Sequence, residues 1–156
     1  MDKVAETASK AKTALSRRAG IVRAFYLASD AGIFRAELFV DDFEFIYPKF
    51  GLGHGVDEFR QMAAGVRVIR RRTVHHHDDF IFIESDRRVV VEGGSEGVGQ
   101  DGVAWCGGQT PGGRFCTVLT FNDADLIESM HVYLDPDVTG ADHERFVTKD
   151  LSKRSW

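Results

Sequence analysis

The stretch RFCTVLTFNDADLIESMHVYL (residues 114–134) decides the fold class of this chain. Residues 114–121 and 126–134 are rich in β-branched and aromatic side chains, which favour strands. Between them, residues 122–125 (Asn-Asp-Ala-Asp) are typical of a tight turn. Strands joined by so short a turn run antiparallel. The stretch therefore predicts the last hairpin of an antiparallel sheet.

Further strands are predicted upstream of this hairpin, and helices before them. The expected strands are residues 43–47, 73–84, 88–97 and 103–106. Apolar residues recur at helical spacing in 3–29, 33–39 and 56–66. Helices gathered at the start of a chain pack on one face of the sheet that follows. We expect one α+β domain over residues 1–156, with its core at about 15–140: a cone-shaped, curved antiparallel sheet with three N-terminal helices enclosing a pocket.

Composition limits the classes of partner. The 156 residues carry a net charge of −4, which argues against nucleic-acid binding. The run Arg67, Arg70, Arg71 and Arg72 is a local exception and is interpreted as a solvated basic turn before a strand. No apolar run is long enough for a membrane span. Cys106 and Cys116 lack metal-ligand spacing and are interpreted as free thiols, with the cytoplasm as the expected compartment. An apolar outer sheet face would need cover, so we expect a homodimer or homotrimer.

Polar side chains are densest in Thr73-Val74-His75-His76-His77-Asp78-Asp79. Because side chains alternate along a strand, His75 and His77 share one face and His76 lies on the other. One bulge would exchange the faces, so which histidine points inward stays open. The two histidines lack a third ligand, so no metal is expected. An exposed polar strand end and a catalytic general base both remain possible interpretations.

Three other residues could complete a general-base site. Imidazole titrates near neutral pH and works best with a carboxylate on its second nitrogen. Asp30 ends the first predicted helix, and Tyr26 lies one turn earlier on the same helix face. Tyr47 ends the first predicted strand, where its hydroxyl could stabilise a developing oxyanion. The alternative for these residues is ordinary core packing or a turn.

Four segments together resemble a known superfamily. They are YLASDAG (26–32), FVDDFEFIYP (39–48), GVDEFRQM (55–62) and TFNDADLIESMHVYLDPD (120–137). In this order they are similar to the nuclear-transport-factor-2-like (NTF2-like) superfamily, also called SnoaL-like, over about residues 15–140. The resemblance implies the cone fold with a central pocket.

The resemblance also implies several chemistries. Scytalone dehydratase, bile-acid dehydratase and hexachlorocyclohexane dehydrochlorinase pair a helix-end aspartate with a histidine that begins the second strand, which implies Asp30 and His75 here. Their tyrosines fall close to Tyr26 and Tyr47, with Phe25 as a rival to Tyr26 in the alignment. The acids of ketosteroid isomerases would fall on Tyr47 and Thr117, neither of which is acidic, so that mechanism is not expected. SnoaL-type cyclases use a base on the last strand, where His131 or Asp135 stand.

We therefore predict a cofactor-independent lyase or isomerase acting on a small, mostly apolar, cyclic substrate, with elimination favoured. The predicted catalytic residues are His75, Asp30, Tyr47 and Tyr26. The predicted substrate-contacting residues are Phe43, Phe45, His77, Thr117, Val132 and Leu134. The alternatives are a non-catalytic binding or dimerisation domain and a SnoaL-type cyclase.

Overall fold

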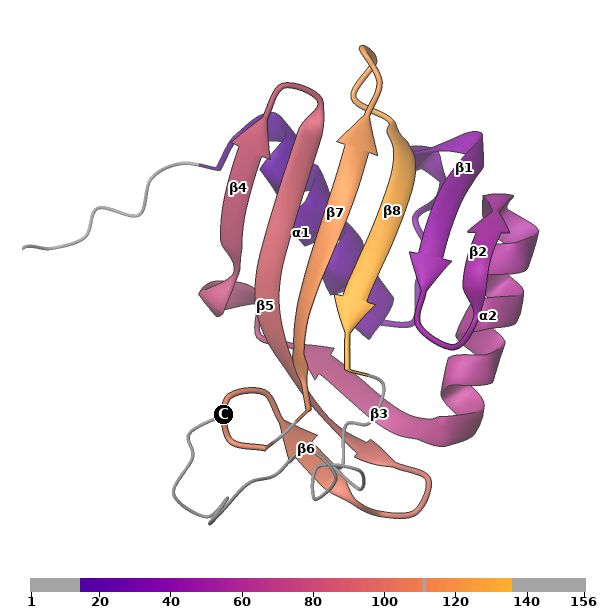
Figure 1. Cartoon of the computed structure of the whole chain (residues 1–156), viewed down its shortest axis with the longest axis vertical. Coiled ribbons are helices and arrows are strands. Elements are labelled where there is room, and N and C mark those ends of the chain that lie inside the picture. The colour runs from indigo at the N-terminus through magenta and orange to yellow at the C-terminus, as the bar shows by residue number, and fades with distance from the viewer. Residues whose placement is uncertain (1–14, 111, 136–156) are drawn as a thin grey trace, which may run out of the picture.

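A computed structural model of the chain describes residues 15–110 and 112–135. These residues form an α+β fold with one curved eight-stranded sheet, in the order β2-β1-β8-β7-β5-β3, and β4 and β6 also pair with β5 (Figure 1). The strands are β1 (Phe39–Tyr47), β2 (Gly51–His54), β3 (Arg70–His75), β4 (Ile81–Ser85), β5 (Arg88–Gly99), β6 (Ala104–Cys106), β7 (Arg114–Phe121) and β8 (Ile127–Leu134). The hairpin predicted at 114–134 is confirmed as β7 and β8.

Two α-helices lie beside the sheet, α1 (Arg17–Asp30) and α2 (Gly55–Ile69). In Figure 1, α1 crosses behind the central strands and α2 stands beside β1 and β2. The Ser16 hydroxyl accepts a hydrogen bond from the Ala19 amide and so caps the start of α1. The part of the first predicted helix at 3–14, like the tail beyond residue 135, lies outside the described residues.

The predicted second helix, 33–39, is wrong. This segment contains one 3-10 turn, η1 (Ala36–Leu38), and Phe39 already begins β1. Seven residues are too few to repay the cost of starting a helix without strong tertiary support. The described N-terminal half therefore holds two α-helices and a single 3-10 turn rather than three helices.

The sheet is mixed rather than purely antiparallel, because β1 pairs in parallel with β8. Tight turns fix the orientation of strands that follow each other, whereas β1 and β8 are separated by a helix and all the other strands. The predicted strand 73–84 is also two strands. β3 and β4 both pair with β5, and the 3-10 turn η2 (His77–Asp79) interrupts them.

β2 (Gly51–His54) is not among the strands expected from the sequence. Gly53 is required there, since a Cβ at this position would lie 2.4 Å from Cζ of Phe45. The missing side chain lets the Phe45 ring lie against the neighbouring strand.

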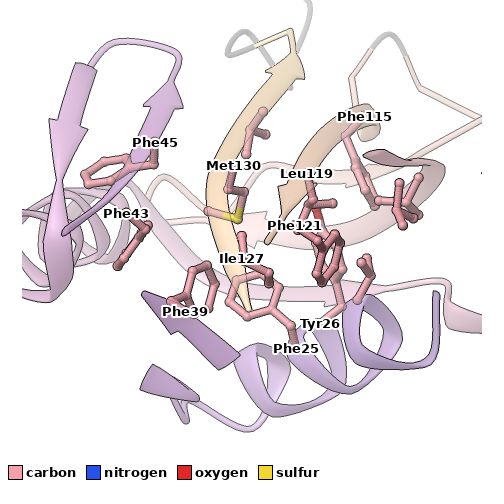
Figure 2. Packing of buried hydrophobic residues seen from close by; sticks show 14 of the residues in the cluster. Phe25, Tyr26, Phe39, Phe43, Phe45, Phe115, Leu119, Phe121, Ile127 and Met130 are labelled. Atoms are coloured by element: carbon pink, nitrogen blue, oxygen red, sulfur yellow. The ribbon is translucent and has the colours of Figure 1, made fainter. Parts of the chain in front are cut away.

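The core lies between α1 and the inner face of the sheet. Phe25 and Tyr26 of α1 point toward the sheet, and Leu119 and Met130 point back toward the helix (Figure 2). Phe43 is fully buried beyond them, at the β1 side. This packing holds α1 at a fixed height over β7 and β8.

The outer face carries a mostly apolar row of side chains, interrupted by His131, that runs from β4 to β2. Strand register aligns Ile83, Val90, Val118, His131, Ile46 and Leu52 in that order. The two ends of the row are the most open, with Ile83 60% and Leu52 57% exposed. Among the described residues, no helix is long and apolar enough to cross a membrane.

Candidate functional site

A cavity of about 400 Å³ lies where α1, α2 and the inner face of the sheet meet. Tyr26 and Asp30 reach it from α1, Tyr47 from the end of β1, and His75 from the end of β3. Its apolar lining comes from Phe25, Phe59, Met62, Ala63, Val66, Phe115, Met130, Val132 and Leu134. The four residues predicted to be catalytic therefore border one cavity.

The Asp30 carboxylate is the centre of the site and accepts three hydrogen bonds. His75 Nδ1 lies 2.6 Å from Oδ1, and the His75 backbone amide donates to Oδ2 at 2.8 Å. His77 Nε2 also lies 2.8 Å from Oδ2. The side chains of Asp30 and His75 are only 14% and 17% exposed, so these contacts are sheltered from water.

Partial burial raises the pKa of the Asp30 carboxyl, but the hydrogen bonds from the ring and amide of His75 and from His77 outweigh it, so the pKa lies below its ordinary value. Asp30 is therefore ionised at neutral pH and accepts hydrogen bonds only. Both imidazoles must then donate to it: His75 carries its proton on Nδ1, and His77 carries its proton on Nε2.

This tautomer leaves Nε2 of His75 as a proton acceptor. No hydrogen bond to that nitrogen is present among residues 15–110 and 112–135. The imidazole is held edge-on against two aromatic rings, Tyr26 at 4.7 Å and Phe115 at 5.3 Å between ring centroids. A bonded Nδ1, an open Nε2 and a dry aromatic setting are the features of a positioned general base.

His77 has a different place from the one predicted. It is absent from the described lining of the cavity and contacts the far oxygen of the Asp30 carboxylate. Its Nδ1 is buried without a hydrogen-bond partner among the described residues, and its backbone oxygen accepts from Arg23 Nη2 at 2.7 Å. The turn η2 carries the His77 ring past the cavity, so it braces Asp30 rather than contacting a ligand.

Thr117 was also predicted to contact substrate, and the structure places it behind the lining. It is fully buried and its hydroxyl shares a 2.7 Å hydrogen bond with the Tyr26 hydroxyl. Burial raises the pKa of Tyr26 far above its usual range, and the Thr117 hydrogen bond offsets this only in part. Tyr26 therefore stays protonated in the cavity wall.

Tyr47 lines the cavity from the end of β1, and its hydroxyl is contacted by a cation. Arg70 Nη1 donates a long, 3.4 Å hydrogen bond to the Tyr47 hydroxyl oxygen. The Arg70 guanidinium is itself held 5.5 Å from the centroid of the Trp105 ring. Since Arg70 uses an acceptor site of the phenol, the hydroxyl proton of Tyr47 is left to donate to a ligand.

Two of the six predicted contact residues, Val132 and Leu134, do line the cavity. Phe43 and Phe45 do not, because both are 0% exposed in the aromatic core. Phe59 of α2 packs against both of these rings and itself faces the cavity. Strand alternation gave the correct face for the two rings, but it could not show that a helix side chain would cover them.

Sequence reasoning missed a group of arginines in the cavity lining, Arg67, Arg70, Arg71 and Arg114. One signal was present in the sequence. Arg71 and Thr73 precede His75 at two-residue steps, which predicts one strand face for all three. All three do line the cavity, together with Arg70, where the register of β3 shifts. The interpretation of the arginine run as a solvated turn is wrong, because Arg67 lies in α2 and Arg70, Arg71 and Arg72 lie in β3.

One group of side chains in the described part of the chain is close enough to hold a metal ion. His76, Glu96 and Cys106 offer ligand atoms that lie within 4.8 Å of one another, on the side of β3 and β5 away from His75. Imidazole, carboxylate and thiolate are ligands that zinc accepts. His75 and His77, the histidine pair considered from the sequence, both contact Asp30 instead.

Comparisons with known proteins bear on the fold. No family model and no curated protein matches the sequence. An NTF2-like protein of unknown function from Burkholderia pseudomallei matches with a TM-score of 0.65 at 20% identity, covering 86% of this chain and all of that one. TerC, co-crystallised with polyporic acid, matches with a TM-score of 0.65 at 21% identity, covering 83% of this chain and 97% of TerC. SalBIII, described as an epoxide hydrolase/cyclase-like enzyme, matches with a TM-score of 0.60 at 14% identity over 78% of this chain and 92% of SalBIII.

These likenesses show that the chain has the NTF2-like fold, as the resemblance implied. At such low identity they show the fold alone, so the chemistry has to be argued from the cavity.

Proposed function

We propose that the protein is a cofactor-independent enzyme that moves a proton within a small cyclic substrate, with His75 as general base and Asp30 as its partner. The observation that carries the proposal is the 2.6 Å contact between His75 Nδ1 and Asp30 Oδ1 at the wall of a 400 Å³ cavity. The shelter of the pair and the open Nε2 support it, because general-base catalysis needs a correctly protonated imidazole within reach of the substrate.

The proposed reaction begins when His75 Nε2 removes a proton from a carbon next to a carbonyl group. The electron pair of the broken C–H bond moves to the carbonyl oxygen, where the Tyr47 hydroxyl donates a hydrogen bond to the enolate. Asp30 stabilises the imidazolium that forms. The imidazolium then returns the proton: to a leaving hydroxyl, which departs as water in an elimination, or to another carbon in an isomerisation.

The substrate is proposed to be compact and mostly apolar in its ring portion. A volume of about 400 Å³ is within the range of ligand sites for one small organic molecule, and aromatic and aliphatic side chains together form the apolar part of its wall. Among proteins of this fold, SalBIII is described as acting in pyran ring formation, and TerC was crystallised with polyporic acid. Both support small cyclic compounds as the substrate class.

The test is base-dependent exchange of carbon-bound hydrogen. The protein is incubated in heavy water with a panel of cyclic ketones and hydroxy ketones, and deuterium uptake is followed by mass spectrometry. We expect uptake with the wild type and none above background with His75→Ala, whose circular dichroism spectrum should be unchanged. His131→Ala is the matched control, since His131 lies on the outer face and contacts Glu44. Full exchange by His75→Ala would remove His75 as the base.

A SnoaL-type cyclase is the second candidate, favoured by Asp135, which lines the cavity just after β8. The other residue expected for that role, His131, is not part of the described lining. If Asp135 were the base, Asp135→Asn would abolish exchange while His75→Ala would retain it. Ligand binding without exchange in any variant would instead indicate the third candidate, a non-catalytic binding domain.

We also propose that the whole chain, residues 1–156, is one domain and forms a homodimer or homotrimer through the outer face of the sheet. The apolar row from Ile83 to Leu52 supports this assembly, because apolar residues that cross an open sheet face are usually covered by a partner.

A further inference from the structure

The cavity carries more positive charge than the proposed proton transfer requires. Its lining contains four arginines, Arg67, Arg70, Arg71 and Arg114, against two aspartates, Asp30 and Asp135. The whole chain has a net charge of −4, so the cavity differs in sign from the average surface. A cleft lined by one sign of charge raises the local concentration of ligands of the opposite sign.

Two of these arginines differ from most arginines of the described residues. Seven described arginines have a carboxylate partner within ion-pair distance: Arg17, Arg18, Arg23, Arg35, Arg60, Arg72 and Arg87. No such carboxylate lies beside Arg67 or Arg71 in the described part of the chain. Arg70 is already engaged by Tyr47 and Trp105. Arg67 and Arg71 thus line the cavity without an ion-pair partner among the described residues.

Arg67 and Arg71 lie closer to solvent than the apolar residues that line the same cavity. Arg67 lies one turn beyond Ala63 on α2, and Arg71 lies two steps before Thr73 on β3. Both arginines are exposed, whereas Phe25, Met62 and Phe115 of the same lining are buried. The cavity is therefore cationic at its solvent rim and apolar toward its floor.

We propose that the ligand of this cavity is anionic, with a carboxylate held at the rim by Arg67 and Arg71 and an apolar ring body inserted toward Phe115. The inference rests on the proposed function in that it concerns the same cavity. Guanidinium groups bind planar carboxylates through paired hydrogen bonds, which fix orientation as well as position. An acid anchored at the rim orients the ring body toward His75, so the arginines would select both the substrate and the carbon that reacts.

The experiment measures binding without turnover, so its outcome is independent of whether His75 acts as a base. The probes are anilinonaphthalene sulfonate, which is anionic, and phenylnaphthylamine, which has the same rings and no charge. Both gain fluorescence in apolar sites. We expect the wild type to bind the anion more tightly, and Arg67→Gln/Arg71→Gln to weaken anion binding roughly tenfold while leaving the neutral probe unchanged. Naphthoate should displace the anionic probe better than naphthamide does.

Three further variants make the result specific. Arg72→Gln is the matched control, because Arg72 adjoins Arg71 but pairs with Glu96 and does not line the cavity; it should bind both probes as the wild type does. Arg67→Lys/Arg71→Lys keeps the charge but loses the paired hydrogen bonds, so its anion affinity should lie between those of the wild type and Arg67→Gln/Arg71→Gln. Ala63→Trp fills the cavity and should weaken both probes.

Two results would overturn the inference. One is equal affinity of Arg67→Gln/Arg71→Gln and the wild type for the anionic probe, and the other is anion binding that survives Ala63→Trp undiminished. Loss of deuterium exchange in His75→Ala with intact anion selectivity would support both proposals. Anion selectivity in a protein that never exchanges hydrogen would support this inference and count against the enzyme.

Discussion

Asp30→Asn is the substitution that tests the site most directly, because it changes charge and proton pattern with little change in shape. The aspartate accepts from two imidazoles through different ring nitrogens, Nδ1 of His75 and Nε2 of His77. We therefore predict opposite tautomers in the native protein, with the proton on Nδ1 of His75 and on Nε2 of His77. An asparagine has only one side-chain oxygen, and its NH₂ group donates. At least one of the two rings must then lose its contact or reverse its tautomer.

The expected cost in stability follows from the three hydrogen bonds. A hydrogen bond to a charged group contributes about 1.5–3 kcal/mol and a neutral one about 0.5–1.5, so losing the charge costs roughly 1 kcal/mol for each contact. The asparagine no longer has to be desolvated as an ion, which returns part of this loss. We expect a net loss of about 2 kcal/mol, which corresponds to a fall of about 4–8 °C in melting temperature.

The stability that the Asp30 carboxylate contributes should change with pH in a direction set by its lowered pKa. Because the pKa of Asp30 is lowered in the folded protein, its ionised form contributes stability that is fully present above the unfolded value, near pH 4. That contribution is lost as the pH falls through the lower folded value. The stability difference between wild type and Asp30→Asn should therefore be largest at neutral pH and should shrink in acid. Urea unfolding at neutral and acidic pH measures it.

Nitrogen NMR of histidine-labelled protein at about pH 8 reports the tautomers, since free imidazoles are neutral there. The wild type should show one Nδ1-protonated and one Nε2-protonated ring that both change in Asp30→Asn. Identical tautomers for His75 and His77 in the wild type, or an unchanged spectrum and stability in Asp30→Asn, would refute the arrangement of the site.

Three further predictions concern the Tyr26 hydrogen bond, the role of His77 and the assembly of the protein. Thr117→Val leaves the buried Tyr26 hydroxyl without its partner and should cost about 1–3 kcal/mol in urea unfolding; an unchanged midpoint would contradict a buried hydrogen bond. His77→Phe keeps a ring, removes one bond to Asp30 and eliminates the unpartnered Nδ1, so it should change stability by less than about 1 kcal/mol while slowing deuterium exchange severalfold. In light scattering at micromolar concentration the wild type should be a dimer or trimer, and Ile83→Lys should shift it toward monomer; a monomeric wild type would exclude assembly through the apolar row.

The fold was largely predictable because its strands carry strong local patterns. Periods of two and short polar turns define β5, β7 and β8 without reference to the rest of the chain. The predictions that failed concern features that are set by contacts between residues far apart in the sequence. The parallel pairing of β1 with β8 is set by packing, and β2 is a strand only because Gly53 makes room for the ring of Phe45.

The site was predictable in part for a similar reason. The end of a helix and the end of a strand are local features, which is why Asp30 and His75 could be proposed as neighbours. Whether a side chain reaches the cavity depends on what stands in front of it. Phe59 covers Phe43 and Phe45, and Tyr26 stands before Thr117. The rim arginines were missed because their sequence pattern equally fits a solvated turn.

Asp30 links the backbone of the edge strand β3 to the proposed base, because its carboxylate contacts both the amide and the imidazole of His75. β3 is the last strand in the sheet order, so its outer side has backbone groups that no neighbouring strand can satisfy. Asp30 accepts the His75 amide there and holds the imidazole of the same residue with its other oxygen. Any Asp30 variant therefore disturbs the strand end together with the base. His75→Gln removes the base and keeps the amide, so a large loss of exchange in His75→Gln with little loss of stability would separate the chemical role from the structural one.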